Sequence, residues 1–461
     1  MNKGCGTLIL AAGKGTRMKS NLPKVLHLML EEPLISYPIS ASHEAGLDDV
    51  CVLVGNEGKA VESYLKKNED VTVAWQTEQK GTGHAVLCAE SFWKEFDSVL
   101  VMPGDVPLIS PETLREFKSQ YDASGSVCSV LTFDVDDPTG YGRIVRCNDK
   151  VSIVEEKDAS ADIKKIREVN SGIYLFNTNE LAIAIKSLTN DNAAGEYYLT
   201  DVLTILQDRG LKVSALKIGV PDEFNGVNNQ LQLAQVTEIA RKKIVEKLML
   251  EKGLRCMDPG TVWIGPRVKI GNNVTIYPSV QLWGDTVVDD EVFIGSFSVL
   301  RSCYIQKCAN LKGSVRMNNG SVGPRASAGP FAFMREGAVL LENAHIGRFV
   351  EIKNSVVGES SMVPHLSYVG DTTIGTHTNL GAGTITCNYD GVNKNKTVIG
   401  DHCLIGSSTM LVAPVTVGDW VSTGAGSVIT QDVPSDALGI ARAKQQNIEN
   451  WAQLHRKDIK K

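Results

Sequence analysis

Aliphatic residues recur at every sixth position in the second half of the chain, and this repeat restricts the fold more than any other feature. The run is unbroken over seven positions: Ile264, Ile270, Ile276, Leu282, Val288, Ile294 and Leu300. Glycine follows many of these aliphatics, as in Ile264-Gly265 and Ile294-Gly295. Such a repeat is typical of a parallel β-helix, in which each aliphatic is buried only by stacking on the next coil. The alternative, a β-sandwich with glycine-rich turns, gives no reason for a strict period of six.

The first half of the chain has a different pattern. Short apolar runs at 8–10, 50–54, 71–75 and 99–102 alternate with helix-like segments at 34–45, 84–96 and 110–121. Ser110 followed by Pro111 is typical of a helix start. Buried strands that alternate with helices predict an α/β domain with a mostly parallel sheet.

A helix is predicted between the two halves. Leu233, Val236, Ala240 and Leu248 recur at steps near 3.6 residues, and Gly253 follows as a stop. We therefore predict an α/β domain over 1–228, a helical linker over 229–251 and a β-helical domain over 252–461. The repeat is lost after Pro434, so the end of this last domain is predicted to be an exposed tail.

Composition excludes several classes of protein. The 461 residues include 47 Lys and Arg against 53 Asp and Glu, a formal net charge of −6, which argues against an electrostatic nucleic-acid binder. No segment approaches the roughly 18 apolar residues of a membrane span. The ten cysteines are scattered without C-x-x-C spacing, as in proteins with reduced thiols. The chain is thus expected to work in the cytoplasm on small molecules, without a nucleic-acid or membrane partner.

A glycine-rich turn directly follows the first predicted strand. It reads Leu10-Ala11-Ala12-Gly13-Lys14-Gly15-Thr16-Arg17-Met18 and leads to Pro23-Lys24. It fits neither of the two common glycine-rich nucleotide motifs. Glycine lets backbone N–H groups approach a phosphate chain, and Arg17 and Lys24 add positive charge. The turn therefore predicts a nucleotide-phosphate site, with a merely tight connection as the alternative.

Further motifs follow this turn in order: Gln76, Gly81-Thr82, Gly104-Asp105 and the loop 140–143. Together they resemble the sugar-nucleotide pyrophosphorylase family. With the hexapeptide half included, residues 4–455 resemble a family of bifunctional enzymes that join an N-acetylglucosamine-1-phosphate uridylyltransferase to a glucosamine-1-phosphate N-acetyltransferase. The resemblance implies a Rossmann-like nucleotidyltransferase domain, a left-handed β-helix and a homotrimer.

The reactions that the resemblance implies make UDP-N-acetylglucosamine, a precursor of peptidoglycan and lipopolysaccharide. The acetyl group of acetyl-CoA is transferred to glucosamine-1-phosphate. The product then takes a uridylyl group from UTP and releases pyrophosphate. Acetyl-CoA and UTP are the co-substrates, and Mg²⁺ is the metal.

For the first site, the resemblance implies that Arg17 and Lys24 stabilise phosphate charge and that Asp105 and Asn228 hold Mg²⁺. Gln76, Gly81 and Thr82 would contact uracil, whereas Glu155 and Asn170 would bind the sugar. The full set for UTP and UDP-N-acetylglucosamine is Leu10, Ala11, Ala12, Gly13, Lys24, Gln76, Gly81, Thr82, Gly104, Asp105, Gly140, Glu155, Asn170 and Asn228. Read alone, Asp105 fits a turn cap, Asn228 a helix N-cap and Glu155 a solvated charge run.

For the second site, acetyl transfer to an amine benefits from a general base, and histidine suits this role near neutral pH. His365 lies in the string 363–371, which resembles the family's catalytic segment. Glu351 would orient His365, and the residues for glucosamine-1-phosphate would be Arg335, Lys353, Tyr368 and Asn379. The acetyl-CoA cleft would be lined by Ala382, Asn388, Tyr389, Ser407, Ala425 and Arg442, and the N–H of Ala382 would support the oxyanion. Read alone, His365 fits a structural role and Glu351 a surface charge.

The six-residue period breaks over 379–391, which predicts a loop that leaves the coil and carries function. Lys394 and Lys396 either meet CoA phosphates or face solvent. Two other functions stay open: a monofunctional sugar-1-phosphate nucleotidyltransferase with a regulatory or oligomerising β-helix, and a non-catalytic scaffold. The Asp105 and Asn228 pair argues against the scaffold, and the string around His365 argues against a single activity.

Overall fold

The structure is a computed structural model that describes residues 3–13, 15–55, 58–147, 150–192 and 194–456. Lys14 of the predicted phosphate turn and residues 457–461 of the predicted tail lie outside the described residues. The chain divides into two compact units, Met1–Ala240 and Arg241–Lys461. In the described part, no helix is long and apolar enough to cross a membrane.

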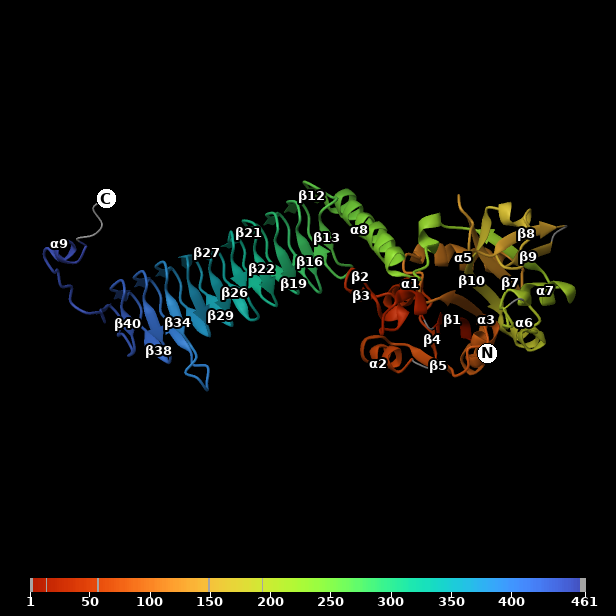
Figure 1. The fold of residues 1–461 in the computed structure, drawn as a ribbon, viewed down its shortest axis with the longest axis horizontal. Coiled ribbons are helices and arrows are strands. Elements are labelled where there is room, and N and C mark those ends of the chain that lie inside the picture. Colours follow the sequence, from red (N-terminus) through yellow and green to blue (C-terminus); the bar gives the residue numbers. More distant parts are fainter. Residues whose placement is uncertain (1–2, 14, 56–57, 148–149, 193, 457–461) are drawn as a thin grey trace. The chain divides into compact units, whose positions relative to one another are not determined.

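A nine-stranded sheet forms the centre of the first unit (Figure 1). Its main path has the order β11-β7-β10-β6-β1-β4-β5, and the hairpin β8-β9 pairs with β10. The bounds are β1 Lys3–Ala11, β4 Val50–Gly55, β5 Thr72–Gln76, β6 Phe96–Pro103, β7 Cys128–Asp134, β8 Arg143–Cys147, β9 Lys150–Val154, β10 Glu168–Asn177 and β11 Val213–Lys217. β10 is antiparallel to β6 and β7, whereas the other neighbours on the path are parallel. The predicted α/β fold with a mostly parallel sheet is confirmed.

The helices of this unit are α1 Ser36–Glu44, α2 Lys59–Asn68, α3 Thr82–Cys88, α4 Glu90–Trp93, α5 Pro111–Ser124, α6 Thr178–Ala184 and α7 Asp201–Asp208. The predicted start of α5 is confirmed, because the Ser110 hydroxyl accepts a hydrogen bond from the Thr113 N–H at 3.2 Å. The single helix predicted over 84–96 is wrong. The chain breaks at Ala89 between α3 and α4, and Phe96 already pairs with β1, where it is 1% exposed. Sheet pairing and burial override the helical pattern there.

Parallel pairing brings the ends of two strands to one edge of the sheet. Leu10 of β1 lies beside Pro103 of β6, and the Gly104 N–H donates to the Leu10 carbonyl at 2.9 Å. The glycine-rich turn after β1 and the Gly104-Asp105 pair therefore lie next to one another. Such edges are where open α/β sheets bind ligands.

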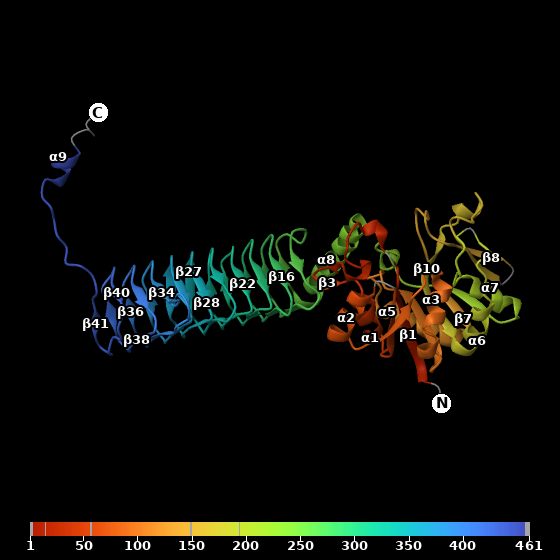
Figure 2. The same ribbon diagram turned by 60° about the horizontal axis from the view of Figure 1, so that its bottom comes forward.

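The second unit is a coil of three parallel sheets with 11, 10 and 9 strands (Figure 2). Its first complete coil contains β13 Trp263–Ile264, β14 Lys269–Ile270 and β15 Thr275–Ile276, one strand for each sheet. Ile264 pairs with Leu282, Ile270 with Val288 and Ile276 with Ile294, so one coil takes 282 − 264 = 18 residues. Three six-residue repeats thus build one triangular coil, and the predicted left-handed β-helix of hexapeptide repeats is confirmed.

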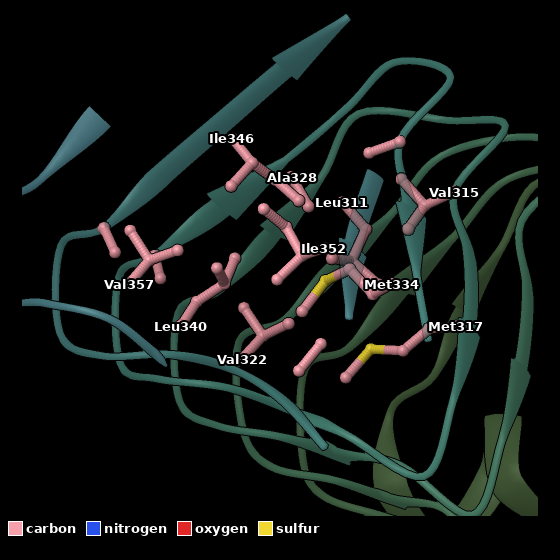
Figure 3. Packing of buried hydrophobic residues seen from close by; sticks show 14 of the residues in the cluster. Leu311, Val315, Met317, Val322, Ala328, Met334, Leu340, Ile346, Ile352 and Val357 are labelled. Atoms are coloured by element: carbon pink, nitrogen blue, oxygen red, sulfur yellow. The ribbon is translucent and has the colours of Figure 1, made fainter. Parts of the chain in front are cut away.

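The repeated aliphatics fill the interior of this coil. The seven residues from Ile264 to Leu300 are at most 6% exposed. Farther along, side chains of successive coils stack in columns, such as Leu340 with Val357 and Met334 with Ile352 (Figure 3). One buried cluster extends from Val245 of α8 (Gln230–Lys252) to Val433. Each coil is therefore stabilised by the apolar surface of its neighbours.

The loop predicted over 379–391 is shorter and begins later. β33 (Asn379–Leu380) and β34 (Ile385–Cys387) still pair with the following coil, and Leu380 is fully buried. The inserted segment is 388–396, between β34 and β35 (Thr397–Ile399), and it projects from the coil (Figure 1). Because the Leu380 side chain is buried in the core, the first part of the predicted loop stays in the β-helix as a paired strand.

Candidate functional site

A cleft of about 390 Å³ opens at the edge of the sheet where β1 and β6 end. This volume falls within the range of small-molecule sites. Eleven predicted residues line it: Leu10, Ala11, Ala12, Gly13, Lys24, Gln76, Gly81, Thr82, Asp105, Glu155 and Asn170. Gly104, Gly140, Asn228 and Arg17 are not among its lining residues, although contacts connect Arg17 and Asn228 to Lys24.

Four predicted side chains meet around one cation. The Lys24 ammonium forms an ion pair with Asp105 and donates to Asn228 Oδ1 at 3.3 Å. Arg17 Nη2 donates to the same Asn228 oxygen at 2.8 Å. The side chains of Lys24 and Asp105 are 16% and 17% exposed, so the pair is largely shielded from solvent. The structure thus brings two oxygen ligands and two cations together from three distant segments.

The oxygens of Asp105 and Asn228 converge on a point that attracts a cation, here the ammonium of Lys24. Mg²⁺ prefers oxygen ligands and retains waters or phosphate oxygens for its other positions. No group of three or more His, Cys, Asp or Glu side chains in the described residues is placed to hold a metal. Two protein oxygens therefore fit a metal that takes its remaining ligands from substrate and water.

The segment from Gln76 to Thr82 closes one side of the cleft. Gly81 has a φ of +106°, and a Cβ there would lie 2.6 Å from the Tyr197 carbonyl oxygen, so this position requires glycine. The Thr82 hydroxyl accepts a hydrogen bond from the Leu199 N–H at 3.0 Å. Gln76 is only 3% exposed, and its amide donates to the Gly81 carbonyl at 3.2 Å.

Glu155 and Asn170 also line the cleft. Burial raises the pKa of Glu155, and the nearby carboxylates Asp158 and Asp201 raise it further. Asn170 is held at both ends of its amide, because Oδ1 accepts from the Gly172 N–H at 2.9 Å and Nδ2 donates to the Tyr174 hydroxyl at 2.7 Å. Asn170 is therefore a fixed polar group in a pocket that is partly apolar, as is usual in small-molecule sites.

In the β-helix, four predicted residues occupy the same corner on successive coils. The His365 carbonyl accepts from the Gly383 N–H at 3.3 Å, and the Ala382 carbonyl accepts from Ser408 at 2.7 Å. The Ser407 carbonyl accepts from the Gly426 N–H at 2.8 Å, and Arg442 donates to the Ala425 carbonyl at 2.7 Å. His365, Ala382, Ser407 and Ala425 therefore form a column along one corner, with Arg442 at its end.

A charged cluster lies on the sheet next to this corner. It is carried by β25 (Phe333–Met334), β28 (Glu351–Lys353) and β31 (Tyr368–Gly370), which pair side by side. Arg335 Nη1 donates to Glu351 Oε1 at 3.0 Å. Among the described contacts, no hydrogen bond joins Glu351 to His365, so the predicted orienting contact is not formed in this arrangement.

Asp371 belongs to this cluster, and sequence reasoning did not assign it a role. It accepts hydrogen bonds from Asn354 at 2.6 Å and from Asn388, and its Oδ2 lies 4.0 Å from Lys353 Nζ. Burial acts to raise the pKa of Asp371, but the two amides and the nearby Lys353 ammonium hold it below its ordinary value. Its position at the end of the string 363–371 was the signal that could have found it.

The cationic side chains of the cluster repel one another. The ammonium of Lys394 in the inserted segment lowers the pKa of Lys353, and burial lowers it further. Clustered cations of this kind suit a dianionic phosphate, which relieves their repulsion. Lys394 therefore lies close to Lys353, one of the residues predicted to bind the sugar phosphate, and does not face only solvent.

Asn379 lies in the sheet next to the cluster, whereas Tyr389 pairs with Lys394 in the inserted segment. Asn379 belongs to β33, which pairs with β30 (Met362–His365) in the neighbouring sheet, and not with β31. Tyr389 is 63% exposed, and its hydroxyl donates to the Gly391 carbonyl within the inserted segment. The structure thus distributes the predicted residues of the second site over two sheets and one loop.

Two family patterns match the chain. The nucleotidyl transferase family covers residues 6–222, and the bacterial transferase hexapeptide family covers 267–302 and 396–431. The bifunctional protein GlmU of Fervidobacterium nodosum is 46% identical over 98% of both chains. The bifunctional protein GlmU of Geotalea uraniireducens is 44% identical over 96% of this chain and 98% of its own length. That of Clostridium beijerinckii is 42% identical over 98% and 99%.

Proposed function

The chain belongs to the family of bifunctional GlmU proteins, and from this premise we propose how its two units divide the work. The protein is an enzyme with two activities, acetyl transfer to glucosamine-1-phosphate and uridylyl transfer to N-acetylglucosamine-1-phosphate. Together they make UDP-N-acetylglucosamine for the cell wall. We assign uridylyl transfer to the cleft of the first unit and acetyl transfer to the column and charged cluster of the second.

In the first unit, the sugar phosphate attacks the α-phosphorus of UTP and pyrophosphate leaves. Such a reaction depends on positioning and on charge neutralisation. Arg17 and Lys24 neutralise the phosphates, Gln76 and Gly81 bind uracil, and Glu155 binds the sugar. The observation that carries this proposal is the meeting of Arg17 and Lys24 with the oxygens of Asp105 and Asn228.

We propose that Asp105 and Asn228 hold Mg²⁺. When bound, the ion neutralises charge on the phosphates. Lys24 then pairs with phosphate oxygens in place of Asp105, because a dianion attracts the ammonium as strongly as the carboxylate does. The chain's own residues thus exchange partners as substrate enters the cleft.

In the second unit, His365 removes the proton from the amine of glucosamine-1-phosphate as it attacks the thioester of acetyl-CoA. The Ala382 N–H stabilises the oxyanion, and Arg335 and Lys353 bind the sugar phosphate. Tyr368 and Asn379 contact the sugar. Asn388, Tyr389, Ser407, Ala425 and Arg442 line the acetyl-CoA cleft.

The β-helix is a fold suited to oligomers, and we propose a homotrimer with acetyl-transfer sites shared between subunits. The exposed side chain of Tyr389, which is 63% accessible in a single chain, supports sharing, because a second chain can cover it. Sedimentation of the protein at micromolar concentration should give the mass of three chains. We further propose that the enzyme works in the cytoplasm, which fits ten free thiols among the described residues.

One assay tests the proposed function. The purified chain receives glucosamine-1-phosphate, acetyl-CoA, UTP and Mg²⁺, and both free thiol and pyrophosphate are followed. We expect both products, with pyrophosphate dependent on the prior acetyl transfer. Thiol without pyrophosphate, or the reverse with added N-acetylglucosamine-1-phosphate, would show that one unit lacks its activity.

A further inference from the structure

The amide of Gln76 has two hydrogen-bond partners inside the protein. Its nitrogen lies 3.2 Å from the carbonyl oxygen of Gly81 and 3.0 Å from Nδ1 of His84. A carbonyl oxygen only accepts hydrogen bonds, so the nitrogen of the amide, and not its oxygen, faces Gly81. The orientation of the Gln76 amide is therefore set by a backbone group with a single possible role.

This orientation also determines the state of His84. The second N–H of the Gln76 amide points at Nδ1, which must therefore accept. Nδ1 therefore faces the amide without a hydrogen, because an N–H there would lie against the N–H of Gln76. Cys88 lies 3.8 Å from each ring nitrogen, and burial raises the pKa of this thiol, so it brings no negative charge to the ring.

The start of α3 holds His84 in place. Gly83 N–H donates to the Tyr197 carbonyl at 2.8 Å, and the Leu199 N–H donates to the Thr82 hydroxyl at 3.0 Å. These two bonds attach the first turn of the helix to the segment 197–199. The imidazole therefore faces Gln76 from a fixed position.

Both N–H groups of Gln76 are thus used within the protein, and its oxygen is left to meet a ligand in the cleft. Uracil presents an N–H at ring position 3, whereas cytosine presents an acceptor there. We infer that His84 is a positioning residue for base selection: it occupies the second N–H of Gln76, so that this side chain offers only an acceptor and favours uracil over cytosine. This inference rests on the proposed uridylyl transfer and on Gln76 as its base contact.

The test compares UTP with CTP in the full-length protein. The ratio of their kcat/KM values for pyrophosphate release is measured with N-acetylglucosamine-1-phosphate in wild type, His84→Leu, His84→Asn and Cys88→Ala. In His84→Leu, only the Gly81 carbonyl still holds the amide nitrogen, so turning the amide over to present an N–H to the acceptor of cytosine breaks one hydrogen bond instead of two. The preference for UTP should then fall about tenfold, the factor that about 1.4 kcal/mol represents. His84→Asn keeps an acceptor near the position of Nδ1 and should keep most of the preference, and Cys88→Ala should keep all of it.

Residual pyrophosphate release with UTP shows that the first unit of each variant is folded. If His84→Leu lowers the rate with UTP and CTP equally, or leaves their ratio unchanged, the inference is overturned. Loss of the preference in His84→Asn or Cys88→Ala would equally overturn it, because neither change should free the amide N–H. A wild-type protein that releases no pyrophosphate with either nucleotide would instead refute the proposed function.

Discussion

Among single residues, Lys24 makes the central contacts of the cleft in the first unit. Its ammonium lies between Asp105 and Asn228, and Arg17 binds the same asparagine oxygen. The neighbouring Lys19 is exposed and has no part in this cluster. Position in the fold therefore distinguishes two lysines that the sequence presents only five residues apart.

We expect Lys24→Met to lower kcat for pyrophosphate release by about 10²-fold, the effect of removing one donor that stabilises developing charge. Lys19→Met is the matched control and should retain wild-type kinetics. Steady-state kinetics with UTP measure both variants. Equal effects of the two changes would mean that Lys24 acts only through general surface charge.

Glu155 should make the KM of the first reaction depend on pH in the acidic range. Because burial raises its pKa, the carboxyl group becomes protonated at a higher pH than an ordinary glutamate, and the neutral group accepts from a sugar hydroxyl more weakly than the carboxylate does. The KM for N-acetylglucosamine-1-phosphate should therefore rise on acidification, beginning above the ordinary range near pH 4.5. In Glu155→Gln this rise should be absent, measured as KM against pH. If Glu155→Gln shows the same rise in KM on acidification, another titratable group causes it.

Among the structural elements, the β-helix could be predicted from the sequence, because an aliphatic residue at every sixth position is a local pattern that is repeated many times. Sheet order in the first unit is not encoded locally: nothing in 84–96 shows that Phe96 pairs with β1. The contact of Arg335 with Glu351 is likewise set by pairing between coils 17 to 18 residues apart. Motifs identified most cleft residues, whereas Asp371 and His84 act through contacts that only the folded chain reveals.

The aliphatic side chains that point into the β-helix should contribute most of its stability. On β35, Ile399 is 1% exposed, whereas the adjacent Val398 is 42% exposed. We expect Ile399→Ala to cost about 2–5 kcal/mol and Val398→Ala much less. The measurement is thiol release that remains at increasing urea concentration, with pyrophosphate release as the internal control. Equal losses in the two variants would contradict the stacked core.

Asp371 ties the inserted segment to the coil. Asp371→Ala leaves the amides of Asn354 and Asn388 without their acceptor. Asn354 is exposed and can turn to water, but Asn388 is only 7% exposed, and a buried N–H group without a partner is costly. We expect thiol release to fall at least tenfold while pyrophosphate release stays unchanged. A normal rate of thiol release would remove Asp371 from the second site.

The whole molecule joins two units with separate cores. One buried cluster belongs to the β-helix, and two others belong to the α/β unit. Each proposed reaction uses side chains of one unit only, so N-acetylglucosamine-1-phosphate must leave one site and enter the other. Loss of either reaction should leave the other intact.

The most direct test mixes two inactive proteins, Asp105→Asn and His365→Gln, in equal amounts. The mixture receives glucosamine-1-phosphate, acetyl-CoA, UTP and Mg²⁺, and UDP-N-acetylglucosamine is measured. Each variant alone should make none, and the mixture should make it, because the first supplies the acetylated sugar phosphate and the second uridylylates it. Folded variants whose mixture makes no UDP-N-acetylglucosamine would contradict two independent sites.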